Sequence, residues 1–190
     1  MKKFFMRTAR LGFSVWTEDD ISEAQELWGN LAVTKFISAN GKMSMEQIHQ
    51  RLQKECETYA VYLIQYWPIY SLENYEHVGC CGLRPYESEK NVLEIGFHLK
   101  EKHWGKGLAE EASRAVIDYA FDVLGVGMLF AGHHPDNIAS SCLLKKLGFI
   151  YSQDSFYPPT GLFHPSYLLA SQAYKKMRSK LTMQMHEDLS

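Results

Sequence analysis

Two glycines lie close together in the stretch His103-Trp104-Gly105-Lys106-Gly107-Leu108-Ala109-Glu110-Glu111-Ala112, which follows a strand-like run and opens an amphipathic helix-like run. A turn here leaves the first backbone N–H groups of the helix without partners inside the helix. These donors and the positive end of the helix dipole form a binding site for an anion. Because glycine has no Cβ atom, a phosphate can come close to the main chain. We therefore predict a phosphate-binding turn, with a plain left-handed turn as the alternative.

Strand-like and helix-like patterns alternate on both sides of this turn. Strands are predicted over residues 11–16, 59–66, 78–83, 92–99, 128–132, 149–156 and 166–170. Helices are predicted over residues 17–31, 44–58, 108–123 and 137–147. The run 92–99 is apolar at nearly every position, which is typical of a central strand covered on both faces. This order predicts an α+β protein with a mixed sheet, as in α/β folds.

Three boundaries are predicted from turn-forming and polar residues. Residues 67–76 contain a proline and an asparagine and are predicted to connect two strands, while Arg84-Pro85 is predicted to end the strand at 78–83. One domain is expected over residues 1–175. The polar residues 176–190 are expected to form a frayed tail.

The composition of the chain excludes several classes of function. With 190 residues and a net charge of −2, the chain lacks the basic footprint of a general nucleic-acid binder. No apolar run approaches the roughly 20 residues that cross a bilayer, so no membrane partner is expected. The first 13 residues contain no continuous apolar segment of a secretory signal, so the expected location is the cytoplasm.

The chain has four cysteines and no CxxC pair; the four are Cys56, Cys80, Cys81 and Cys142. Two of them are adjacent and are predicted to point to opposite faces of a strand. Reduced thiols are the preferred interpretation, and no metal site is expected. His133 and His134 are also adjacent, so their side chains are not expected to share one metal ion.

Two well-known phosphate-binding loops do not fit the glycine turn. A dinucleotide loop requires the spacing G-x-G-x-x-G, but counting from Gly105 the third glycine position is Glu110. A Walker A loop requires a glycine where Lys100 stands, and a serine or threonine where Gly107 stands. The phosphate ligand is therefore of another kind.

A second block, Pro135-Asp136-Asn137-Ile138-Ala139-Ser140-Ser141-Cys142-Leu143-Leu144-Lys145-Lys146-Leu147-Gly148-Phe149, lies downstream of the turn. Together the two blocks resemble the GNAT N-acetyltransferases, which use acetyl-CoA. The turn matches the family pattern Q/R-x-x-G-x-G/A at Gly107 and Ala109. The second block matches N-x-x-S/A-x-x-L-x-x-K-x-G-F at Asn137, Ser140, Leu143, Lys146, Gly148 and Phe149.

The chain is most similar to the RimJ/RimL-like branch of this family, which acetylates protein α-amino groups among other amines. This resemblance covers roughly residues 8–172 and includes the segments 8–11, 18–20, 33–37, 79–83, 94–97 and 104–107. Trp104 stands where many family members have glutamine or arginine, a replacement common in this branch. Leu144 stands where many members carry a tyrosine that protonates the leaving thiolate, so that acid is absent here.

The resemblance implies a fold and a cofactor site. The expected fold is the GNAT fold, a central and mostly antiparallel sheet flanked by helices, in which the fourth and fifth strands splay apart. Main-chain groups of Phe97 and Leu99 are implied to hold the thioester arm of acetyl-CoA, and Asn137 to contact its pantetheine arm while it also caps a helix. The implied contacts to acetyl-CoA are Phe97, His98, Leu99, Trp104, Gly105, Lys106, Gly107, Leu108, Ala109, Asn137 and Ser140.

Two residues are candidates for the proton transfers. Glu94 lies within a predicted central strand, where a carboxylate is costly unless it is paired or used, so we interpret it as the general base. An exposed glutamate at the start of the strand is the alternative. His98 shares its face and is expected to titrate near neutrality or to be structural. The resemblance makes Ser140 a substitute acid for the thiolate.

The expected activity is transfer of the acetyl group of acetyl-CoA to a primary amine, either a protein N-terminus or a small amine, by direct attack in a ternary complex. An aminoglycoside or polyamine acceptor, and a non-catalytic acyl-CoA-binding module, are the alternatives. A homodimer is a further expectation. The aromatic residues considered for the acceptor pocket, or else for core packing, are Tyr66, Trp67, Tyr70, Tyr86, Phe156 and Tyr157.

Overall fold

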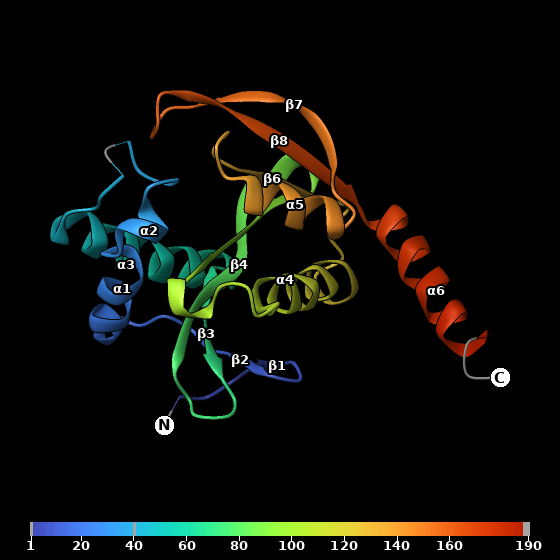
Figure 1. Ribbon diagram of the computed structural model, residues 1–190, viewed down its shortest axis with the longest axis horizontal. Coiled ribbons are helices and arrows are strands. Elements are labelled where there is room, and N and C mark those ends of the chain that lie inside the picture. The colour runs from blue at the N-terminus through green and yellow to red at the C-terminus, as the bar shows by residue number, and fades with distance from the viewer. Residues whose placement is uncertain (1, 40, 188–190) are drawn as a thin grey trace.

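The computed structural model describes residues 2–39 and 41–187, and its eight strands form one sheet in the order β1-β2-β3-β4-β5-β6-β8-β7 (Figure 1). The strands are β1 (Met6–Arg7), β2 (Leu11–Phe13), β3 (Tyr66–Ser71), β4 (His77–Glu87), β5 (Val92–Leu99), β6 (Met128–Gly132), β7 (Ile150–Tyr157) and β8 (Leu162–Ala170). β5 and β6 are parallel, and the other neighbours are antiparallel. The mixed, mostly antiparallel sheet confirms the predicted fold class.

Helices cover both faces of the sheet. They are α1 (Ile21–Trp28), α2 (Leu31–Thr34), α3 (Met45–Tyr62), α4 (Leu108–Asp118), α5 (Ile138–Lys146) and α6 (Ser171–Glu187), with short helical turns at Glu18–Asp20, Ser88–Lys90, Glu101–His103 and Tyr119–Val123. No helix within residues 2–39 and 41–187 combines the length and the apolar character that a membrane span requires.

Two hydrophobic clusters lie on opposite faces of the sheet. Cys81 packs with α4 residues in the larger cluster, and Cys80 packs with α1 and α3 residues in the smaller one. Figure 1 shows α1 and α3 on one side of β4 and α4 on the other. The two adjacent cysteines therefore point to opposite faces, as their spacing predicts.

The central strands diverge in the middle of the sheet. β5 pairs with β6 only at Val92, Leu93 and Glu94, although β5 continues to Leu99. The ranges 92–99 and 128–132 agree with the sequence prediction, and they are the fourth and fifth predicted strands. The predicted splay is thus present, between the strands labelled β5 and β6.

The prediction of a strand over residues 59–66 is wrong except at Tyr66, where β3 begins. Residues 59–62 complete α3, which begins at a capping box between Ser44 and Gln47 and ends at Leu63 in the left-handed conformation (φ 58°). Val61 is 70% exposed, and α3 packs through Ile48 and Leu52 earlier in the helix, so packing of the amphipathic helix as a whole outweighs the local β propensity of this segment.

Two proline-based boundaries are also wrong. Residues 67–71, expected to belong to a connection, lie in the buried strand β3, which spans Tyr66–Ser71. β2 ends at Phe13, opposite Ile69, so Pro68 lies just beyond that ladder and needs no N–H. Likewise β4 continues past Pro85, because β3 has no residue paired beyond Gly82 and a bulge follows Pro85.

The C-terminal segment differs from the predicted tail. α6 is helical through Glu187 and projects away from the sheet (Figure 1). Tyr174 and Met177 pack against the larger cluster, and Arg178 donates to Asp122 at 2.6 Å. These contacts give the polar segment a place to dock that its composition does not reveal, and residues 188–190 lie outside the described residues.

Candidate active site

Two adjacent cavities open where β5 and β6 separate. The first has a volume of about 410 Å³ and lies against the glycine turn, and the second has a volume of about 230 Å³ and lies toward β6 and the β7–β8 hairpin. The residues that line both cavities are Phe36, Ile37, Phe97, His98, Asn137 and Ser140. Because the two cavities share these lining residues, a ligand in one cavity lies next to a ligand in the other.

The glycine turn has the conformation that its sequence predicts. Gly105 and Gly107 have φ values of 71° and 73°, which residues other than glycine rarely adopt. A Cβ atom built on Gly105 would meet nothing within 4 Å, so the space above the turn is open. α4 begins immediately after Gly107, and its first N–H groups face the turn without helical partners. This arrangement fits a phosphate-bearing ligand.

Trp104 attaches the turn to the sheet. Its indole N–H donates to the carbonyl oxygen of Leu99 at 2.8 Å, at the end of β5. The predicted cofactor residues that line the first cavity are Phe97, His98, Leu99, Trp104, Gly105, Gly107, Leu108, Ala109, Asn137 and Ser140. Lys106 does not line it and instead lines a neighbouring cavity beside Arg10.

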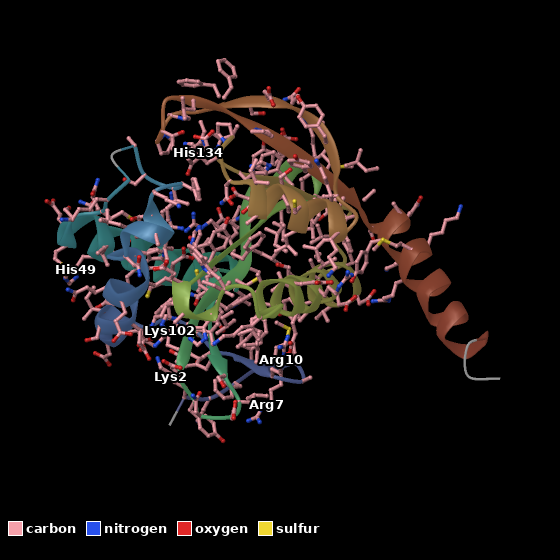
Figure 2. The ribbon with its side chains drawn as sticks, in the orientation of Figure 1. Lys2, Arg7, Arg10, His49, Lys102 and His134 are labelled. Atoms are coloured by element: carbon pink, nitrogen blue, oxygen red, sulfur yellow. The ribbon has the colours of Figure 1, made fainter. Side chains whose placement is uncertain are left out.

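A clamp from the N-terminal segment holds the start of α4. The Glu111 carboxylate accepts hydrogen bonds from the Thr8 hydroxyl at 2.6 Å, from the Arg10 backbone N–H at 2.8 Å and from the Arg10 Nε at 2.6 Å. Arg10 also donates to the carbonyl oxygen of Lys106 at 2.9 Å, and it lies between β2 and α4 (Figure 2). The clamp therefore connects the N-terminal segment to both the turn and the first turn of α4.

One edge of β5 is free beyond Glu94. The N–H of Lys100 donates to Val78 in β4 at 2.9 Å, so the alternate residues Phe97 and Leu99 direct their main-chain groups to the other edge. β6 has no paired residue there. The Leu99 carbonyl oxygen already accepts the Trp104 indole N–H, whereas the main-chain groups of Phe97 and the N–H of Leu99 face this open edge and are available to an extended ligand.

α5 contributes its N-terminal turn to both cavities. The Asn137 side chain accepts from the Ser140 backbone N–H at 3.1 Å, which confirms the predicted N-cap. Ser140 lies in the shared wall, one turn into the helix. Leu144, at the place of the family tyrosine, is buried and offers no proton.

Glu94 lies at the last position where β5 pairs with β6, which is where the two strands begin to splay apart. Its carboxylate accepts a hydrogen bond from the Tyr66 hydroxyl at 2.6 Å. Tyr66 reaches it from β3 because Gly82 and Gly96 occupy the register positions in between, and a Cβ atom on Gly96 would lie 2.3 Å from the Tyr66 hydroxyl oxygen. Burial, reinforced by the Glu94 carboxylate, raises the pKa of Tyr66 well above 10, so the hydroxyl stays a donor.

His98 does not titrate near neutrality, contrary to one of the expectations above. Burial, reinforced by Arg51 and Arg84, lowers the pKa of His98 well below 6.5. The Trp28 indole N–H donates to its Nδ1 at 3.4 Å. The structural interpretation of the ring therefore holds, and its position between the cavities makes it part of their wall.

The second cavity includes part of the predicted aromatic set. Tyr66, Tyr86, Phe156 and Tyr157 line it, whereas Trp67 and Tyr70 are buried elsewhere. Sequence reasoning did not assign the following lining residues to a site: Phe36, Ile37, Arg51, Arg84, Phe130, His133, His134 and His164. They come from six separate segments, so no local spacing connects them. Within the described part of the chain, no group of His, Cys, Asp or Glu side chains is arranged to hold a metal ion.

Comparison with known proteins identifies the family. The sequence model of the family described as acetyltransferase (GNAT) domain matches residues 10–150 of the chain. A Bacillus licheniformis protein described as "Uncharacterized N-acetyltransferase p20" is 30% identical over 142 residues, which are 75% of this chain and 80% of the relative.

Solved structures share the fold. A GNAT-family acetyltransferase from Bacillus anthracis superposes with a TM-score of 0.75 at 20% identity, covering 90% of this chain and 99% of the other. RimL, a ribosomal L7/L12 alpha-N-protein acetyltransferase solved with coenzyme A, gives a TM-score of 0.73 at 15% identity, covering 88% and 98%. The family match, the fold and the open glycine turn agree. The chain is a member of the GNAT family, an acetyltransferase that uses acetyl-CoA.

Proposed function

We propose that the chain transfers the acetyl group of acetyl-CoA to a primary amine, a protein N-terminal α-amino group or a small amine, by direct attack in a ternary complex. The observation that carries this proposal is the shared wall of the two cavities, in which His98, Asn137 and Ser140 face both sides. The fold similarity to RimL supports an acceptor of the RimJ/RimL-like kind.

The first cavity suits acetyl-CoA. The open space at Gly105 and the unpartnered N–H groups at the start of α4 fit its pyrophosphate. The free edge of β5 at Phe97 and Leu99 fits its amide-containing arm, with Asn137 opposite. When bound, acetyl-CoA supplies the thioester from which the acetyl group is transferred.

Glu94 is the base in this proposal. An amine with an ordinary pKa near 10 is mostly protonated at neutral pH and must lose a proton before it attacks. The Glu94 carboxylate lies in the second cavity and takes this proton at its oxygen atoms, while the Tyr66 hydroxyl keeps the carboxylate oriented.

Ser140 is the acid in this proposal. The departing thiolate needs a proton, and Leu144 has none to give. The Ser140 hydroxyl lies in the wall between the cavities, and its backbone is held by the Asn137 cap. It donates its proton to the thiolate, directly or through water, and takes up in exchange the second proton that the attacking nitrogen loses as the amide forms.

The test is thiol release from acetyl-CoA with a panel of peptides and small amines. The Glu94→Gln variant is expected to lower kcat by about 100-fold or more while acetyl-CoA affinity is retained. Glu101→Gln is the matched control, because Glu101 is an exposed carboxylate near the turn that receives no hydrogen bond or ion pair from the described residues. Binding of acetyl-CoA without turnover of any amine would instead favour a non-catalytic acyl-CoA-binding module.

A polyamine or aminoglycoside acceptor is not favoured by the second cavity. Such polycations need a strongly acidic cleft, whereas Glu94 is the single carboxylate among the described residues that line this cavity. Two arginines, Arg51 and Arg84, line the same cavity.

A further inference from the structure

Arg51 is a cation without an anionic partner in the second cavity. It extends from α3, is half-buried and lies over the ring of Trp28 at 4.9 Å. Its Nε atom is shielded from solvent and has no hydrogen-bond partner, and no described carboxylate lies within ion-pair distance of its guanidinium. A shielded charge of this kind is costly unless a ligand or another group compensates it.

The other charges near this cavity already have partners. Arg84 forms an ion pair with the fully buried Glu55, which also accepts from the Tyr66 backbone N–H at 2.9 Å. Glu94 accepts from the Tyr66 hydroxyl. The charge of Arg51 therefore remains uncompensated by contact when the surrounding pairs are complete.

Three of the four histidines that line the cavity do not change this balance at neutral pH. Burial lowers the pKa of His98 well below its ordinary value, and it also lowers the pKa values of His133 and His164. His134 lies beside the β7–β8 hairpin, with its ring 5.5 Å from that of His164 (Figure 2). The cavity thus presents one carboxylate for a cation and one free guanidinium for an anion.

We propose that the acceptor amine carries a carboxylate, which Arg51 binds while Glu94 receives the amine. This inference rests on the proposed acetyl transfer and names the substrate class of the same site. A guanidinium matches a carboxylate with two parallel hydrogen bonds, which is the strongest pairing available to Arg51. The volume of about 230 Å³ suits an aminocarboxylic acid, or the first residue of a peptide with an acidic side chain.

The test uses matched acceptors that differ only in charge. Free amino acids are compared with their carboxamides, and peptides beginning with Asp or Glu with peptides beginning with Asn or Gln. The acid of a pair is expected to have a kcat/KM about 10- to 100-fold above that of its amide, because a hydrogen-bonded ion pair is lost in the amide. The pair with the larger ratio identifies the source of the carboxylate.

The Arg51→Gln variant is expected to remove this preference. Its kcat/KM should fall about 10- to 100-fold for the acid and change less than about threefold for the amide. Lys54→Gln is the matched control, because Lys54 is an exposed cation on the same helix and lies outside the cavity lining. Thermal melting and acetyl-CoA affinity show that the Arg51 variant remains folded.

Four results would overturn the inference. If acids and amides are turned over equally, or if kcat/KM falls equally for both in Arg51→Gln, the acceptor does not need a carboxylate, and the proposed acetyl transfer is unaffected. Absence of turnover with every amine overturns both the transfer and the substrate class. A preference for acids that persists in Arg51→Gln assigns the carboxylate to another residue.

Discussion

Replacing Glu111 by alanine removes the acceptor of the clamp that holds the glycine turn. Three hydrogen bonds to a charged group disappear, from the Thr8 hydroxyl, the Arg10 backbone and the Arg10 guanidinium. One such bond contributes about 1.5–3 kcal/mol when it is shielded from water. The Arg10 side chain is 51% exposed, so water compensates for much of the free energy that its hydrogen bonds contribute. Only the bond from Thr8 is counted in full. The expected loss of stability is about 2 kcal/mol.

The assay is thermal unfolding at pH 7, with acetyl-CoA affinity as the second readout. For a chain of this length, about 2 kcal/mol lowers the Tm by about 4–8 °C. Affinity for acetyl-CoA should also fall by several fold, because Arg10 no longer holds the Lys106 carbonyl group. Glu101→Ala removes an exposed carboxylate near the turn and is expected to stay within about 0.5 kcal/mol of the unmodified protein.

The stability that Glu111 contributes depends on pH with a definite sign. Burial raises the pKa of Glu111, but hydrogen bonds from Thr8 and Arg10 lower it more, and the resulting pKa lies below the ordinary 4.5. The unfolded chain therefore binds the proton more readily than the folded one. The contribution is complete above pH 4.5 and is lost as the pH falls through the depressed pKa. A Tm difference for Glu111→Ala that is no larger than that of Glu101→Ala, or that grows as the pH falls, would refute this reasoning.

Two further substitutions test the two cavities separately. Gly107→Glu places a non-glycine residue at φ 73° and adds a carboxylate at the anion site, so acetyl-CoA affinity measured by calorimetry should fall at least about tenfold. The control is Gly161→Glu, which introduces the same residue at φ 69° in a distant turn. Unchanged affinity in Gly107→Glu would place the cofactor site elsewhere. Tyr66→Phe removes the hydrogen bond to Glu94 but keeps the ring, so kcat for thiol release should fall about tenfold with acetyl-CoA affinity unchanged, and an unaltered kcat would contradict the orienting role of Tyr66.

The sequence determined most about those parts of the site that lie in one continuous stretch. The turn at Gly105 and Gly107 and the Asn137 cap were predicted because backbone conformation and capping depend on neighbours a few residues apart. The strand 92–99 was predicted with its observed bounds because a central strand is apolar on both faces. Glu94 was singled out for the same reason, as a carboxylate inside that strand.

Tertiary structure decided what surrounds Glu94. The hydrogen bond from Tyr66 depends on the register of β3, β4 and β5, and the sequence places Tyr66 in a strand but predicts a connection for residues 67–71, which continue β3. The low pKa of His98 depends on burial, which no spacing shows. The clamp of Glu111 joins residues about a hundred positions apart in the chain.

The cofactor site and the acceptor cavity thus differ in how much of them a sequence reveals. Backbone N–H groups at a helix start bind an anion without help from distant side chains, so a few adjacent residues of the glycine turn are enough to predict an anion site. The second cavity is assembled from α3, β4, β5, β6 and the β7–β8 hairpin. Only the tertiary structure shows that Arg51 has no anionic partner, because folding decides which side chains surround its charge.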